Sequence, residues 1–445
     1  MDFIVVLQIL VLFGAIYLGV RMGGMGIGYA GGLGVVVLSM CLGMKAGNIA
    51  VDVILIIASV IAAISALQAA GGLDFLVQIA ERLLRKHPKH INYLAPLVAY
   101  FLTMFAGTGH TAFSIIPVIV EVAKGQNIKP SAPLSLAVVA SQIGITASPI
   151  SAAVVAMTGI VEPLGLGYPT LLAIVISTSF FGILITSFLY NTFANLDLSS
   201  DKIYKERLKA GLVAEVKEAQ YKSVSADAKL SVWIFALGVL VVVAYALVIS
   251  KSVGLIQNPT LGRNEAIMSF MLVVGALIVL SCGVKSEKLL DTSVFKSGMN
   301  ACICVLGIAW LGDTFVSNHT DAIKSFASAV VSDHPYVLAI VLYFASSLLY
   351  SQAVTTKALI PTVVIAMGLT PEHHENLWVV VASFAAVSGL FVLPTYPTTL
   401  GAIAMDDTGT TRVGKYVFDH SFIVPGTLMV AITVALGFVI APVLI

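Results

Sequence analysis

Apolar runs long enough to cross a lipid bilayer recur along almost the whole of this sequence. A membrane-spanning helix needs about 20 consecutive, mostly apolar residues. We expect such spans near 3–20, 25–43, 51–70, 132–158, 169–191, 231–250, 265–283, 298–316, 377–405 and 421–443. Soluble domains of this size carry about one-quarter charged residues, whereas 11% of this chain is charged. The sequence therefore predicts an all-α polytopic membrane protein whose solvent is mostly lipid.

Two further apolar stretches, 92–123 and 336–368, are too long for one span and are interrupted near the middle. The interruptions read Gly107-Thr108-Gly109-His110 and Tyr350-Ser351-Gln352. We expect both stretches to form re-entrant hairpins, which enter and leave the membrane on one side. Backbone that is not helical at membrane depth is tolerated only where it is buried in protein or lines a cavity. Both hairpin tips are therefore candidate site elements.

The hairpins divide the chain into two similar halves. Each tip is followed at matched intervals by two prolines, which are Pro117 and Pro149 in the first half and Pro361 and Pro394 in the second. We predict a first repeat over 1–194, a cytoplasmic linker over 195–229 and a second repeat over 230–445. Five crossings and one hairpin in each half make the second repeat inverted relative to the first.

Basic residues orient this topology. They gather before and after the first hairpin, in the stretch 195–229 and in later loops that the scheme places on the same side. Because Lys and Arg favour the cytoplasmic side, both chain termini are predicted to be periplasmic. The first apolar run, Phe3 to Val20, has no basic segment before it and no small-residue cleavage site after it, so we expect a true span and not a signal peptide.

Four segments converge in this scheme, namely the two hairpin tips and proline-containing breaks in the spans 132–158 and 377–405. Proline in a helix removes a hydrogen bond and clashes with the preceding turn, so both spans should unwind. Unwinding exposes backbone N–H groups and helix N-termini that carry roughly half a positive charge, which suits carboxylate oxygens. The predicted substrate-binding residues are Gly107, Thr108, Gly109, His110, Thr146, Ser148, Pro149, Ser351, Gln352, Thr355, Lys357, Pro394, Thr395, Tyr396 and Thr398.

Several of these features also have a purely structural interpretation. An isolated proline is often only a kink, although matched breaks in both halves favour a site. Lys357 can meet one carboxylate of a dianion or extend to the periplasmic interface. His110 can donate to a carboxylate or pack as a neutral donor to backbone. The Gly-rich run from Gly23 to Gly34 predicts close helix packing, with a subunit interface as one location.

Other classes of function find little support. A net charge of +1 argues against a nucleic-acid partner. Cys302 and Cys304 point to nearly opposite sides of a helix, so neither a metal site nor a cofactor is predicted. A membrane-embedded enzyme would need a catalytic constellation, and the densest cluster, His373-His374 with two flanking glutamates, lies on a polar loop after Pro371. A channel remains the other alternative, since broken spans occur there too.

Several strings of residues resemble the anaerobic four-carbon dicarboxylate uptake (Dcu) family, closest to its DcuA branch. They are, in order, GGLDFLVQIAERLLRKHPK, FAGTGH, ITASPISAAVV, LGIAWLGDTFVSN, LYSQA, GLFVLPTYPT and MDDTGTTRVGKYVF. The resemblance runs from about residue 20 to the C-terminus. It implies an antiporter that exchanges fumarate, malate or aspartate against succinate across a bacterial inner membrane by alternating access.

The family looks like a member of a wider ion-transporter superfamily. That likeness implies a homodimer in which a scaffold holds the subunit contact and a transport part moves like an elevator. The alternative activity within the superfamily is cation-coupled symport of di- or tricarboxylates. Sodium-coupled members carry Ser-Asn-Thr at both tips, whereas this chain has Gly-Thr-Gly-His and Ser-Gln-Ala. The resemblance therefore does not imply that transport by this chain is coupled to sodium.

Overall fold

Helices make up the architecture of this chain. The computed structural model describes residues 1–445 except 1–2, 23–24, 50, 216–222, 251–252, 254, 320, 323–333, 335, 395 and 417, and the described part contains no β-strand. Within it, six helical segments are long and apolar enough to cross a membrane. These are α3 (Val51–Ala69), α9 (Tyr168–Phe193), α11 (Ala226–Val248), α12 (Arg263–Ser281), the continuous segment Ser293–Asn318, and α21 (Ile423–Leu444).

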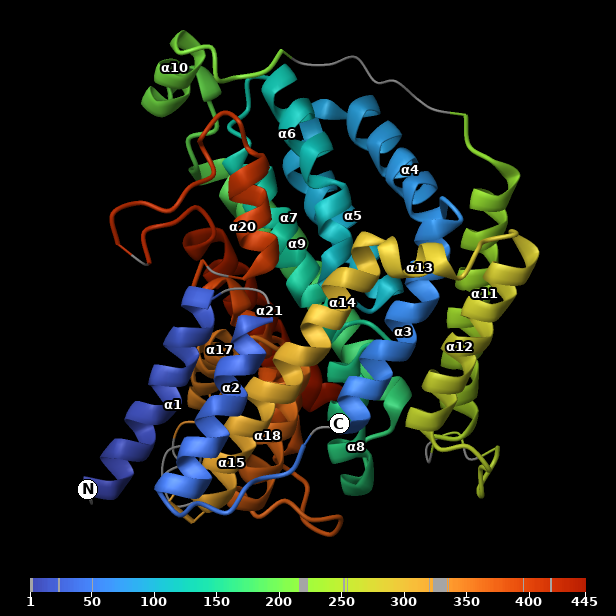
Figure 1. Ribbon diagram of the computed structural model, residues 1–445, viewed down its shortest axis with the longest axis vertical. Coiled ribbons are helices and arrows are strands. Elements are labelled where there is room, and N and C mark those ends of the chain that lie inside the picture. Colours follow the sequence, from blue (N-terminus) through green and yellow to red (C-terminus); the bar gives the residue numbers. More distant parts are fainter. Residues whose placement is uncertain are drawn as a thin grey trace.

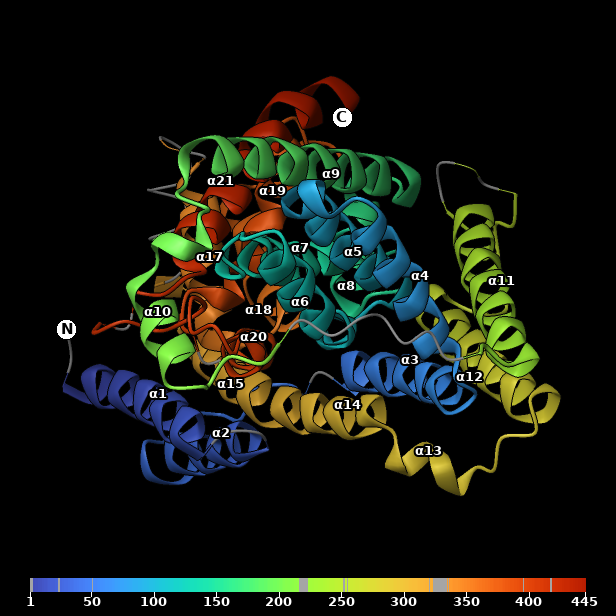
Figure 2. The same cartoon turned by 90° about the horizontal axis from the view of Figure 1, so that it is seen from above.

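The helices form an outer layer and an inner bundle (Figure 1). The outer layer contains α3, α11 and α12 together with α1 (Phe3–Met22), α2 (Gly26–Val36), η1 (Val37–Cys41), α4 (Gly72–Lys86), α13 (Glu287–Asp291), α14 (Ser293–Cys304), η6 (Val305–Ala309) and α15 (Trp310–Asn318). Figure 2 shows α1, α2, α14 and α3 along one side of the bundle, with α11 and α12 at one end.

The inner bundle is built from both halves of the chain. From the first half come η2 (Pro88–His90), α5 (Ile91–Ala106), η3 (Gly109–Ser114), α6 (Ile116–Gly125), α7 (Ser131–Thr146), α8 (Ala152–Val161), η4 (Glu162–Leu164) and α9. From the second half come α17 (Val337–Leu349), α18 (Gln352–Ala366), α19 (Leu377–Ser383), η7 (Phe384–Phe391), α20 (Pro397–Met405) and α21. Within the inner bundle, the helix pairs α5 and α7, α17 and η7, and α9 and α21 pack most extensively.

Glycines bring α2 into direct backbone contact with η6, a π-helical turn. A Cβ atom on Gly28 would overlap the carbonyl group of Ile303, and one on Gly307 would overlap the carbonyl group of Gly28. Small residues allow helix backbones to approach this closely. The close packing predicted for the Gly-rich run is therefore present, and its partner is another helix of the same chain.

The expected helix breaks are all present. The first hairpin stretch is divided at Gly107 between α5 and η3, and the second is divided between α17 and α18 at Tyr350-Ser351. The two proline-containing spans are divided as well, at 147–151 between α7 and α8 and at 392–396 between η7 and α20. Four pairs of short helices thus meet in the interior of the molecule.

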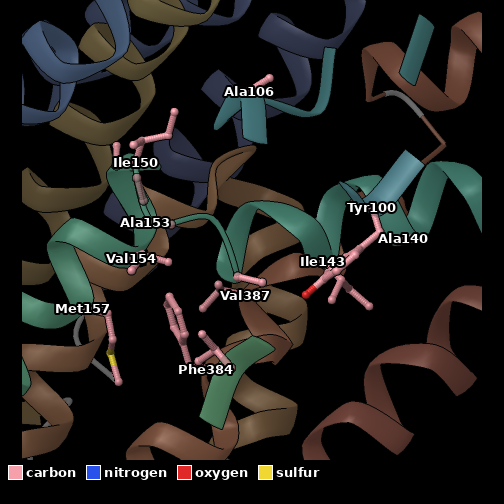
Figure 3. Packing of buried hydrophobic residues seen from close by; sticks show 14 of the residues in the cluster. Tyr100, Ala106, Ala140, Ile143, Ile150, Ala153, Val154, Met157, Phe384 and Val387 are labelled. Atoms are coloured by element: carbon pink, nitrogen blue, oxygen red, sulfur yellow. The ribbon is translucent and has the colours of Figure 1, made fainter. Parts of the chain in front are cut away.

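The core of the inner bundle is aliphatic and aromatic. Tyr100 of α5 is fully buried, and its hydroxyl lies 2.8 Å from the hydroxyl of Ser179 on α9. Figure 3 shows part of this core, where Val154 of α8 and Phe384 of η7 lie close together. Among membrane-spanning helices such packing stabilises the bundle mainly through van der Waals contacts.

The linker is fastened to the inner bundle. Its described part contains η5 (Leu198–Ser200) and α10 (Lys202–Lys209). The Arg207 Nε donates to the backbone oxygen of Asp407 at 2.9 Å, and the Asp407 carboxylate pairs with Lys124 at 2.8 Å. These contacts join the linker to α6 and to the loop after α20.

Candidate functional site

A cavity of about 400 Å³ lies where the four interrupted segments meet. The inner bundle contributes the two hairpin tips and both breaks to its lining, and the outer layer contributes side chains from α2, α3, α14 and η6. Its lining consists of Ile27, Ile56, Ile57, Val60, Ile61, Gly107, Thr108, Gly109, Ile145, Ile150, Ala152, Ala153, Asn300, Cys304, Val305, Ile308, Leu349, Tyr350, Ser351, Gln352, Ala353, Tyr396, Pro397 and Leu400.

Three helices begin at this cavity. Ala152 and Ala153 open α8, Gln352 and Ala353 open α18, and Pro397 opens α20. The first turn of a helix presents unpaired backbone N–H groups and a partial positive charge. None of the described lining residues is charged. The polarity of the site therefore comes from backbone N–H groups, hydroxyls and amides, which is an arrangement suited to an anion.

The two hairpin tips close in the same way. The α5 helix ends at Gly107 with φ +69°, and α17 ends at Tyr350 with φ +55°. In both tips the N–H of this residue donates to the carbonyl four residues earlier, at 2.8 Å for Gly107 and 3.0 Å for Tyr350. A bulky residue in this left-handed region is uncommon. The conformation turns the chain sharply enough for the following helix to begin at the cavity.

A buried amide network supports the second tip. The Gln352 Nε2 donates to the backbone oxygen of Gln142 on α7 at 3.1 Å, and the hydroxyl of Ser388 donates to the same oxygen at 3.3 Å. The Gln142 side chain in turn reaches Thr398 of α20 at 3.5 Å. Since α7, α18, η7 and α20 all contribute, this network fixes the second tip relative to both breaks.

The structure brings six predicted site residues to the cavity surface and leaves others behind it. Lining residues from the prediction are Gly107, Thr108, Gly109, Ser351, Gln352 and Tyr396. Thr146, Ser148, Pro149, Thr355, Pro394 and Thr398 lie in or beside the same breaks but do not line the cavity. Thr146 and Thr355 donate to backbone carbonyls of their own helices, Ile143 and Ser351, at 2.8 Å each. Thr395 and the side chain of His110 lie outside the described residues.

Lys357 has an arrangement that the sequence analysis did not anticipate. Its ammonium group forms an ion pair with the carboxylate of Asp52 on α3. Both side chains line a second cavity, of about 450 Å³, which shares only Ile56 and Ala152 with the first. Lys357 is therefore not part of the lining of the first cavity.

Sequence reasoning missed the outer-layer side of the site. Asn300 and Cys304 of α14 and the aliphatic residues of α3 face the tips across the cavity. In the sequence, these residues belong to segments predicted only as membrane-spanning helices. No pattern indicated which face of these helices meets the tips. The described side chains on this wall are mainly isoleucine and valine, and most of the polar groups come from the inner bundle.

Interrupted helices around a cavity at which three helix N-termini meet, among helices long enough to cross a bilayer, define a multi-pass membrane transporter. The chain belongs to the anaerobic C4-dicarboxylate membrane transporter family, whose model matches residues 4–445. It is similar to the C4-dicarboxylate transporter DcuA of Helicobacter pylori strain 26695, with 61% identity and 98% of both chains covered. The DcuA of Escherichia coli K12 is 53% identical over 98% of both chains.

More distant relatives agree with this assignment. The anaerobic C4-dicarboxylate transporter DcuB of Escherichia coli O6:H1 is 37% identical over 98% of both chains. The fold is similar to that of the Alcanivorax borkumensis YdaH transporter, with a TM-score of 0.52, 14% identity, and 85% of this chain and 84% of that chain covered. Because the relatives are transporters, the chain is a transporter and not an enzyme.

Proposed function

We propose that this protein is a secondary active antiporter that exchanges fumarate, malate or aspartate against succinate by alternating access. The names of its relatives support four-carbon dicarboxylates as the substrate class. The observation that carries the proposal is the uncharged cavity at which the N-termini of α8, α18 and α20 meet the two hairpin tips. Its volume, about 400 Å³, is at the small end of the usual range for ligand sites.

The cavity suits a dianion with an apolar centre. Backbone N–H groups and the polar side chains of Thr108, Ser351 and Gln352 replace water around the two carboxylates. The hydrocarbon centre lies against the aliphatic wall formed by residues such as Ile56 and Val60. When the site is empty, the partial positive charge of the three helix N-termini is not balanced by an anion, and burying unbalanced charge is costly. This cost opposes movement of the empty site across the membrane and so favours exchange over leak.

The lengths of two helices support the re-entrant and interrupted segments of the inverted topology that we propose. The helices α6 and α8 have 10 residues each, which at about 1.5 Å per residue is about half of a hydrocarbon core about 30 Å thick. In this topology the repeats 1–194 and 230–445 are inverted and the linker 195–229 is cytoplasmic. Both termini lie in the periplasm of a bacterial inner-membrane protein. The inner bundle then moves like an elevator against an outer layer that forms the homodimer contact.

Counterflow in proteoliposomes tests the exchange activity directly. Vesicles loaded with unlabelled succinate should accumulate labelled fumarate, malate, aspartate or succinate faster than empty vesicles. A channel would show no such trans-stimulation. The same assay with and without a sodium gradient separates antiport from the alternative, cation-coupled symport. Absence of trans-stimulation for all four substrates would contradict the proposal.

Cys304 provides a chemical test of the site. Its thiol lines the cavity, and a variant that keeps this cysteine but carries serine at Cys41, Cys282 and Cys302 allows it to be modified alone. A methanethiosulfonate reagent should inhibit exchange. Succinate at about ten times its Kd should slow this modification about tenfold, because only free sites react.

The matched control is the same variant with Cys304 also replaced by serine, which should resist the reagent. Modification of Cys304 at a rate that does not depend on succinate would show that the substrate binds elsewhere.

A further inference from the structure

Among the described residues, three ion pairs connect the outer layer to the inner bundle. Arg85 of α4 pairs with Glu121 of α6, and the other two pairs lie on the side of the second cavity. One joins Asp52, near the start of α3, to Lys357 on α18. The other joins Arg263, the first residue of α12, to Glu162, the first residue of η4. In each pair one partner belongs to the outer layer and the other to the inner bundle. Neither pair lines the substrate cavity.

One pair lines the second cavity, and the other lies next to residues that line it. Asp52 and Lys357 are part of its lining. Asn264, which follows Arg263, and Gly159 and Ile160, which precede Glu162, are also part of it. The two pairs therefore border the same space between the layers, next to the wall residues Ile56 and Ala152 that this space shares with the substrate cavity.

The Asp52–Lys357 pair is suited to reversible contact. The side chain of Asp52 is 43% exposed, and that of Lys357 is 31% exposed. Ion pairs this exposed add little stability, because water solvates the separated charges well. Breaking this pair therefore costs little, and the pair can form and open as the layers move.

The Arg263–Glu162 pair has closer geometry and a link to the substrate site. Two guanidinium nitrogens meet the two carboxylate oxygens, at 2.9 and 3.1 Å. The guanidinium also lies 4.9 Å from the centre of the Tyr168 ring, and the Tyr168 hydroxyl donates to the carbonyl of Pro149 at 2.9 Å. Pro149 is in the break between α7 and α8. Arg263 of the outer layer is thus connected through Tyr168 to the break between α7 and α8, which lies beside the substrate cavity.

We infer that these two ion pairs are a latch that holds the inner bundle against the outer layer in one transport state and opens in every cycle. The inference rests on the proposed alternating-access exchange. Relative movement of the two layers separates Asp52 from Lys357 and Arg263 from Glu162, and it opens the second cavity, which adjoins the substrate cavity at Ile56 and Ala152.

Cross-linking the first pair tests the latch. In a chain lacking its four native cysteines, Asp52→Cys and Lys357→Cys are combined and joined by a short bifunctional methanethiosulfonate reagent. We expect the linked protein to lose succinate counterflow down to the level of protein-free vesicles. Reduction with dithiothreitol should restore it. The linked protein should still bind succinate, measured by thermal shift in detergent, because the substrate cavity is separate.

The control is the same pair of substitutions at an ion pair within the outer layer, Asp291→Cys and Lys296→Cys, whose charged groups lie 4.0 Å apart. Linking these two positions should leave counterflow unchanged. Full counterflow by the protein linked between positions 52 and 357 would overturn the latch while leaving exchange intact. In contrast, absence of trans-stimulation in the unmodified protein would refute the proposed exchange itself.

If the double cysteine variant is inactive before linking, exchange of the two charges between positions 52 and 357 tests the latch instead. Lys357→Asp alone places two carboxylates together and should impair exchange, and adding Asp52→Lys should restore most of it. Failure of the swapped pair to recover any activity would overturn the latch.

Discussion

Replacing Ala353 with aspartate is expected to abolish dicarboxylate exchange without unfolding the protein. Ala353 is the second residue of α18 and lines the substrate cavity. An acidic residue in the first turn of a helix is favourable, by about 0.3–1 kcal/mol, so folding should tolerate it. The new carboxylate would lie at the N-terminus of α18, where we expect a carboxylate of the substrate to bind. Two unit charges about 6 Å apart repel by about 3 kcal/mol at an effective dielectric constant of about 20, which corresponds to at least about 100-fold weaker binding.

The control for this prediction is Ala353→Asn, which has nearly the same shape without the charge. Its exchange rate should stay within about tenfold of that of the unmodified protein, because the net contribution of one hydrogen bond corresponds to a factor of about ten. Succinate counterflow and detergent-phase melting are measured on both variants. Equal activity of the aspartate and asparagine variants would show that the N-terminus of α18 does not face the substrate.

Replacing Gly307 with alanine is expected to be among the most destabilising small changes in the chain. The added Cβ would overlap the backbone carbonyl of Gly28, and backbone cannot move aside as a flexible side chain can. Overpacking of this kind costs about 1–3 kcal/mol, and occasionally more. We expect a lower melting temperature and loss of monodisperse protein in size-exclusion chromatography.

Gly32, on the same helix α2, provides the contrast. Apart from the chain neighbours and backbone of its own helix, no described atom lies within 4 Å of a Cβ built at Gly32, so alanine there should be neutral or stabilise the helix by about 0.5–1 kcal/mol. Equal melting temperatures of Gly307→Ala and Gly32→Ala would mean that α2 and η6 are not in contact.

Much of the helical framework could be predicted from the sequence, because lipid allows few alternatives. Apolar runs of sufficient length must be helices, and prolines and glycines within them indicate where they are interrupted. This reasoning located the breaks at Gly107, Tyr350-Ser351, Pro149 and Pro394. It did not predict the amphipathic helix α4, although Leu73, Ala80 and Leu84 lie on one buried face of it.

Contacts between distant helices could not be predicted in this way. The apolar helix α3 presents similar residues on most of its faces, so periodicity does not show which face meets the hairpin tips. For the same reason, Asp52 as the partner of Lys357 had no local signal, since 305 residues separate the two positions. Thr398 was predicted as a site residue for its hydroxyl, yet it is fully buried behind the cavity.

The aliphatic wall of the substrate cavity has a consequence for the energetic barrier to movement. Isoleucine and valine side chains on α3 offer no directional bonds to the tips that face them. Sliding one surface along such a wall exchanges weak dispersion contacts for equivalent ones a few ångströms away. If the inner bundle moves as proposed, we therefore expect this wall to keep the energetic barrier low at every intermediate position.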